Sequence, residues 1–168
     1  MLQTVARQKA VAPRGGTVLS IDLPIACAES WRRGIYTGAP DTDPGAPEWR
    51  AEKYFLPGEA DLDAHPRLLL MWAGERMTPL DAISWGKRYG LRRTHPLEVF
   101  ALSAAFPYLY WGFGLKGVGL VPTQLGQYCR KPHACSVWQS LKRGAREAKL
   151  QPADAGLHDQ TIFVFGEY

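Results

Sequence analysis

The chain has 168 residues, of which 46% are hydrophobic and 21% charged, which is typical of one folded domain and excludes an intrinsically disordered chain. Its formal net charge of +4 is mild. The three cysteines are an odd number, which argues against a disulfide framework and indicates a reducing, cytoplasmic compartment.

The N-terminal part predicts an arm followed by a hairpin. Residues 1–16 carry basic side chains without the apolar run of a signal peptide, so we expect a flexible basic arm. The apolar stretch at 17–26 predicts a first strand. Residues 32–34 supply a turn, and residues 35–37 predict a strand that returns beside the first.

An acidic loop and a buried strand come next. Residues 39–66 are rich in proline and acids, so we expect a loop with one short helix near residues 48–54. The continuous apolar run at 67–72 predicts a central strand buried on both faces, as in a parallel sheet.

Two helix starts follow. In the first, Thr78 is the expected cap and Pro79 the first helical residue, with an end near Gly90. The second helix begins at Thr94 and runs to about residue 105 or 106. The uncharged stretch from Val99 to Leu115 is short for a membrane span and contains one proline and two glycines. It therefore favours a buried helix followed by a loop, and no membrane contact.

The C-terminal part mixes strands and helices. We expect a strand at 117–121, a short helix at 123–128, and a long helix at 134–150 with an apolar stripe at helical spacing. Residues 161–165 are prone to form a strand, with a helix as the alternative. Residues 17–168 are thus predicted to form a single mixed α/β domain.

Four carboxylates are candidate ligands for a hard cation. Asp22 follows an apolar strand, Glu75 follows the second strand, and Asp159 lies near the C-terminus with Asp154 close before it. Carboxylate oxygens suit Mg²⁺ or Mn²⁺, and two such ions can assist phosphodiester hydrolysis. Each acid also has an ordinary interpretation, as a strand-end cap, a surface turn residue or a helix start. His158 is a candidate base or ligand, or simply a polar turn residue.

The order of these motifs resembles the RuvC-like Holliday-junction resolvases, especially the small phage-encoded ones. The segments that carry the resemblance cover about residues 17–165, and they are TVLSIDLPIA with IYTG, HPRLLLMWAGE, GVGLVPTQLGQY and ADAGLHDQ. The resemblance implies an RNase H-like fold, in which a mixed central sheet is flanked by helices. It also implies a bacterial or phage-infected host cell as the setting.

The resemblance implies a structure-selective DNA endonuclease that acts as a homodimer on branched DNA. Asp22 would bridge two Mg²⁺ ions, Asp159 would hold one of them, and Glu75 would hold the other or none. Two alternatives stay open. One is a catalytically degenerate DNA-binding or assembly subunit, because Glu75 lies three residues beyond Trp72 and Gln160 follows the last acid. The other is a partner-binding protein that docks through the aromatic and glycine-rich segment 106–114.

Basic residues concentrate in the second half of the chain, opposite the acidic loop. A phosphate-binding surface there would position DNA without reading its sequence, and a solvated basic face is the alternative. The candidates are Lys87, Arg88, Arg92, Arg93, Arg130, Lys131, Lys142, Arg143, Arg146 and Lys149.

Two further segments invite a functional interpretation. Cys129, His133 and Cys135 could bind zinc with Cys27 as a fourth ligand, although buried or incidental thiols are favoured. The aromatic segment 106–114 is a candidate for core packing, for a dimer surface, or for stacking on unpaired bases.

Overall fold

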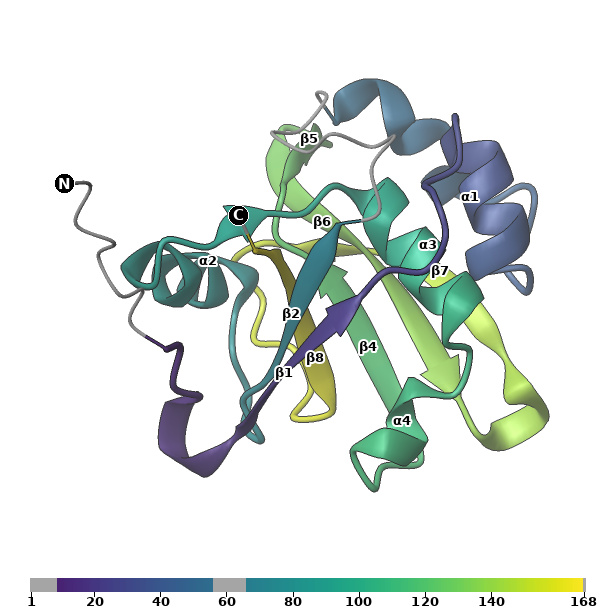
Figure 1. Cartoon of the computed structure of the whole chain (residues 1–168). Helices are drawn as coiled ribbons and strands as arrows, with labels where there is room; N and C mark the ends of the chain where they lie inside the picture. Colours follow the sequence, from purple (N-terminus) through teal and green to yellow (C-terminus); the bar gives the residue numbers. More distant parts are fainter. Residues whose placement is uncertain (1–8, 56–65, 168) are drawn as a thin grey trace, which may run out of the picture.

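An eight-stranded sheet organises the computed structural model, which describes residues 9–55 and 66–167 (Figure 1). The strand order is β1-β2-β8-β4-β6-β5, while β3 pairs with β8 and β7 with β6. Only β4 and β8 pair in parallel among these described strands. The strands are β1 (Thr17–Asp22), β2 (Arg67–Trp72), β3 (Arg92–Arg93), β4 (Gly117–Pro122), β5 (Gly126–Tyr128), β6 (Lys131–Ser140), β7 (Arg146–Pro152) and β8 (Thr161–Gly166).

Helices cover both faces of the sheet, which confirms a mixed α/β domain (Figure 1). On one face α1, α3, α4 and the 3₁₀ helix η2 enclose the larger core. On the other face α2 packs its Trp85 against Phe165 of β8. The helices are η1 (Pro13–Gly15), α1 (Trp31–Gly38), η2 (Pro47–Tyr54), α2 (Pro79–Arg88), α3 (Pro96–Ala105), α4 (Leu109–Gly112) and η3 (Lys142–Gly144).

Several elements match the prediction because their signals are local. Strand β2 has the predicted bounds and is buried, although both its neighbours are antiparallel rather than parallel. The side chain of Thr78 caps α2 by accepting from the Asp81 backbone N–H at 3.0 Å. Helix α3 begins at Pro96, two residues later than predicted, because His95 rather than Thr94 is its N-cap.

Three predicted elements are wrong. The return strand of the N-terminal hairpin is helix α1, which Ser30 caps by accepting from the Arg33 N–H at 3.3 Å. The predicted helix at 134–150 is instead the hairpin of β6 and β7, and the predicted helix at 123–128 contains strand β5. The first strand ends at Asp22 rather than at residue 26.

Two close contacts fix the layer that carries α1. A Cβ atom at Gly38 would lie 2.2 Å from the Phe100 carbonyl oxygen, so α1 can approach α3 only with glycine there. Arg146 then fastens the end of both helices, because its Nη1 donates to the carbonyls of Thr37 and Ser103 at 3.1 Å each. A cation at two helix C-termini is favoured by both helix dipoles.

No helix within the described residues is long and apolar enough to cross a membrane. The stretch from Val99 to Leu115 contributes most of α3, a loop and α4. Of the predicted N-terminal arm, residues 1–8 lie outside the described residues, as do residues 56–65 of the acidic loop.

Candidate nucleic-acid interface

Asp22 occupies the exposed end of an edge strand. β1 pairs only with β2 within the described chain, so Asp22 is not at the centre of the sheet as predicted. Its side chain is 81% exposed, and Oδ1 lies 3.9 Å from Nη1 of Arg67, the residue opposite it in the register. An ion pair at this exposure contributes little to stability, and it leaves the carboxylate in water.

Glu75 and Asp159 lie at the opposite end of the sheet. β2 runs from Arg67, opposite Asp22, to Trp72, and Glu75 follows three residues later. Asp159 precedes β8, and its carbonyl accepts from Trp72 Nε1 at 2.7 Å, at the same end. Six strand residues separate the two ends by about 17 Å. The prediction that Asp22, Glu75 and Asp159 form one metal-holding cluster is therefore wrong.

The remaining candidate ligands do not assemble either. Asp154 is exposed in the β7–β8 connection, and His158 Nδ1 lies 2.8 Å from Asp159 Oδ1 on the surface. Of the proposed zinc ligands, Cys129 is exposed at the β5–β6 turn whereas Cys135 is fully buried. Within residues 9–55 and 66–167, no group of three or more His, Cys, Asp or Glu side chains could hold a metal ion.

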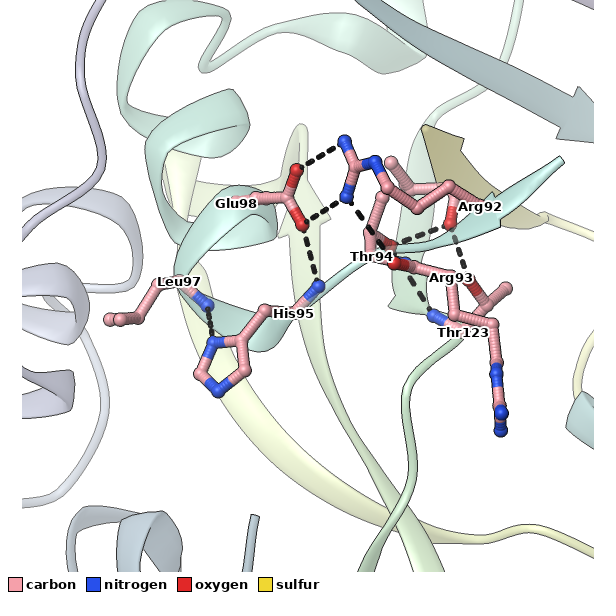
Figure 2. A network of polar contacts seen from close by, with 8 residues as sticks. Arg92, Arg93, Thr94, His95, Leu97, Glu98 and Thr123 are labelled. Carbon is pink, nitrogen blue, oxygen red and sulfur yellow. Dashed lines mark hydrogen bonds and ion pairs between the residues drawn. The ribbon is translucent and has the colours of Figure 1, made fainter. Parts of the chain in front are cut away.

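Arg92 belongs to the core rather than to a DNA-binding face (Figure 2). Its two Nη atoms lie 3.1 and 2.8 Å from the two carboxylate oxygens of Glu98, and both side chains are buried. Glu98 also accepts from the His95 backbone N–H at 2.7 Å, which completes the capping box of α3. The predicted role of Arg92 in phosphate binding is therefore wrong, because the guanidinium is enclosed and already paired.

Arg146 is also engaged within the protein, since it closes the C-termini of α1 and α3. The acidic loop contributes to the same region, because Asp41 accepts from the Arg146 backbone N–H at 2.7 Å. Farther along, Glu52 accepts from the Trp31 N–H at 3.1 Å. Part of the acidic segment thus satisfies backbone donors rather than repelling a ligand.

The other predicted phosphate-binding residues are exposed but lie at three separate places. Lys87 and Arg88 are in the last turn of α2, and Arg93 is on the short strand β3. Arg130 and Lys131 are at the β5–β6 turn. The β6–β7 hairpin carries Lys142 and Arg143 at its turn and Lys149 on β7.

Aromatic side chains gather at the end of the sheet where β4 begins. Tyr108 is the N-cap of the short helix α4 and Trp111 lies within it, and the two are 54% and 64% exposed. Their rings stack with centroids 5.2 Å apart and planes at 21°. Tyr110 next to them is buried, and the rings of Phe113 and Trp72 meet edge to face with their centroids 6.2 Å apart. The segment 106–114 is therefore core on one side and an exposed aromatic pair on the other.

Cations lie at this same end of the sheet. We call it the α4 end and define it by Tyr108, Trp111, Lys116, Trp138, Leu141, Lys142 and Arg143. Lys116 follows α4, and its carbonyl accepts from the Leu141 N–H at 2.9 Å, which ties the β6–β7 turn to the start of β4. Figure 1 places α4 and that turn at one end of the sheet. Glu75 and Asp159 also lie at this end, on the β2 and β8 side.

The sequence analysis missed Lys116, Trp138 and Leu141 as members of this end. The helical interpretation of residues 134–150 placed Trp138 and Leu141 in a buried stripe. A signal was present, because Gly144 follows Arg143 at the centre of a segment whose apolar residues also alternate. In the hairpin, Arg143 and Gly144 both have positive φ, at 66° and 60°.

A hollow of about 1080 Å³ lies beside α1, and Cys27 is in its wall. The pKa of the Cys27 thiol is raised to about 12, chiefly by burial and also by the nearby Glu98 carboxylate, while Arg92 opposes the rise. A thiol with this pKa is protonated at neutral pH and is a poor nucleophile. The hollow therefore lacks an activated cysteine.

The geometry thus gives one end of the sheet that carries an exposed stacked aromatic pair and cations, and within the described residues no cluster of acids, histidines or cysteines that could hold a metal ion. Comparison with known proteins finds no matching protein-family model, no matching curated protein and no matching solved structure.

Proposed function

We propose that the protein binds DNA through the α4 end of the sheet and does not hydrolyse it with the predicted carboxylates. The observation that carries the proposal is the exposed, stacked pair of Tyr108 and Trp111 at the same end of the sheet as Lys116 and the turn residues Lys142 and Arg143. Aromatic faces stack on bases of any sequence, and cations hold the phosphates between them. The expected ligand is DNA whose base faces are accessible, as in a branched or single-stranded form.

Two features favour binding without cleavage. Asp22 lies about 17 Å along the strands from the end that holds Asp159, whereas the metals of a two-metal site are about 4 Å apart. The carboxylate of Asp22 lies 3.9 Å from the Arg67 guanidinium, which also pairs with Glu167 at 2.8 Å. Of the RuvC resemblance, the proposal keeps DNA as the ligand and a mixed sheet with flanking helices. It omits an RNase H-like strand order, because β1 is an edge strand.

A partner protein is the competing ligand for the exposed aromatic pair, because aromatic residues are also common at protein interfaces. The three cations at the same end favour a polyanion instead, since charged residues other than arginine are depleted at the centre of protein interfaces. The salt dependence of binding distinguishes DNA from a partner protein. DNA binding weakens steeply as salt rises, because phosphate contacts release counterions.

The test is a titration of fluorescently labelled DNA, as a single strand and as a four-way junction, at several salt concentrations with and without Mg²⁺. We expect binding that weakens with salt, quenching of Trp111 fluorescence, and no cleavage. Replacing Lys142 and Arg143 by glutamine should weaken binding about 10-fold at low salt and flatten the salt dependence. Trp111→Ala should weaken it about 5- to 100-fold.

Two matched controls keep the result specific. Replacing both Arg32 and Arg33 by glutamine removes an equal charge from exposed positions of α1, and Tyr36→Ala removes an aromatic ring that is 76% exposed on the same helix. Neither should change the affinity. Cleavage of the junction that Asp22→Asn abolishes would overturn the proposal in favour of the nuclease, and absence of DNA binding at low salt would favour the partner protein. The homodimer stays a prediction, which sedimentation equilibrium tests.

A further inference from the structure

A hollow of about 390 Å³ opens at the α4 end of the sheet, on the side of β6. Its wall consists of Lys116, Gly117, Trp138, Ser140, Leu141, Lys142 and Gln160. The volume lies near the lower end of the roughly 300–1,000 Å³ that small-molecule pockets occupy. It therefore fits a ligand about the size of one nucleotide rather than a peptide or a duplex.

The indole of Trp138 forms the flat part of this wall. Its ring lies across β4, because a Cβ atom at Gly117 would be 3.1 Å from Cζ2 and one at Gly119 would be 3.4 Å from Cε3. Two glycines on the same face of β4 thus let the indole lie against the backbone, where a larger side chain would lift it. One face of the ring is held by the strand, and the His158 ring contacts it edge-on at 6.3 Å.

The polar side-chain groups around the indole are available to bind a ligand. The side-chain amide of Gln160 and the indole Nε1 of Trp138 make no hydrogen bond to any described residue, and Lys116 and Lys142 form no ion pair within the same part of the chain. The Gln160 backbone, in contrast, is fixed, because its carbonyl accepts from the Gly119 N–H at 3.0 Å. A fixed backbone with an uncommitted amide suits recognition of a polar ligand edge.

We propose that this hollow holds one unpaired nucleotide, with its base on Trp138, its phosphate on Lys116 and Lys142, and its polar edge against the Gln160 amide. The inference rests on the proposed DNA-binding function and specifies its ligand. Both faces of a base in a duplex are covered by its neighbours, so only an unpaired or extruded base can enter the hollow. An amide offers a donor and an acceptor together, which is what the Watson–Crick edge of a base presents.

The test compares three DNAs of equal length and label: a thymidine strand, the same strand with one abasic position, and a duplex. The proteins are the wild type, Trp138→Ala, Trp138→Phe and Gln160→Ala. Trp138→Ala should weaken binding of the single strand about 5- to 100-fold and leave the duplex unchanged. Trp138→Phe should restore most of the affinity, because it keeps a stacking face. Gln160→Ala should weaken binding of the thymidine strand, because the amide no longer meets the base edge, and leave the duplex unchanged.

Thermal unfolding of each variant checks that the fold is intact, and Trp138→Phe provides the comparison if the alanine variant is destabilised. If Trp138→Ala and Trp138→Phe bind every DNA as the wild type does, while Trp111→Ala weakens binding, the nucleotide site is refuted and DNA binding at the α4 end stands. Equal losses on single strand and duplex also refute the nucleotide site. If the wild type binds none of the three DNAs, both proposals fail.

Discussion

At the scale of single residues, the buried pair of Arg92 and Glu98 is a stability determinant that can be tested directly. Glu98→Gln removes the charge that compensates the buried Arg92 guanidinium, which otherwise donates to the Arg93 carbonyl at 3.3 Å. Breaking a buried pair in this way costs about 3–5 kcal/mol. We expect that loss in urea unfolding, whereas Arg93→Gln next to it, on an exposed side chain, should change stability by less than about 0.5 kcal/mol. Equal effects of the two substitutions would contradict the role of burial.

His95 makes the stability of the fold depend on pH. Burial lowers the pKa of its imidazole from 6.5 to about 4, and its Nδ1 accepts from the Leu97 N–H at 3.1 Å and so is unprotonated. Because the folded pKa is lower, the unfolded chain binds the proton first, and stability falls as pH drops from 6.5 towards 4. By pH 4 the loss is at most about 3 kcal/mol.

Urea unfolding between pH 4 and 7 measures this dependence, with His95→Asn as the comparison. Asparagine keeps an N-cap oxygen for α3 but does not titrate. The difference in unfolding free energy between wild type and variant should therefore shrink as the pH falls. A difference that stays constant across this range would show that His95 is not the titrating group.

At the scale of elements, the turn between β5 and β6 is strained. Cys129 and Arg130 have φ of 50° and 62°, the left-handed region that favours asparagine and glycine in a two-residue hairpin. Replacing them by Asn-Gly should raise the free energy of unfolding by about 1 kcal/mol. Thermal or urea unfolding measures it. Arg33→Gly supplies the opposite sign, because glycine inside α1 costs about 1 kcal/mol.

The same scale separates what the sequence could predict from what it could not. Thr78, Pro79 and Asp81 specify the start of α2 by themselves, since a cap depends on neighbours within one turn. The apolar residues of 134–150 are compatible both with one face of a helix and with the alternation of strands. Pairing of β6 with β4 and β7 makes this segment a hairpin. Ser30 was a usable cap signal for α1, but the expected hairpin concealed it.

At the scale of the whole molecule, the candidate site depended on strand order, which no local pattern contains. Asp22 does lie on the predicted first strand, but that strand is at the edge of the sheet and antiparallel to β2. The pairing sends Asp22 and Asp159 to opposite ends. The α4 end likewise joins residues from α4, β4 and the β6–β7 turn that are far apart along the chain.

Strand β8 holds the two halves of the sheet together. It pairs with β2 on one side and with β4 on the other. Four of its residues are each at most 1% exposed: Ile162, Phe163, Val164 and Phe165. A chain that stops at residue 160 should therefore show no cooperative urea transition and little dispersion of amide signals in NMR spectra. Removing only Glu167 and Tyr168 should cost about 1 kcal/mol or less, because the ion pair of Glu167 with Arg67 is partly exposed. A cooperative transition in the shorter chain would contradict the central role of β8.

The position of β8 also affects how the protein is made. Until the ribosome has added residues 161–166, the nascent chain contains β2 and β4 without the strand that lies between them. The edges of β2 and β4 that pair with β8 are then unpaired. Unpaired, apolar strand edges invite contact between neighbouring chains. We therefore expect rapid synthesis to raise the yield of inclusion bodies, and a chaperone that shields such edges during elongation to lower it.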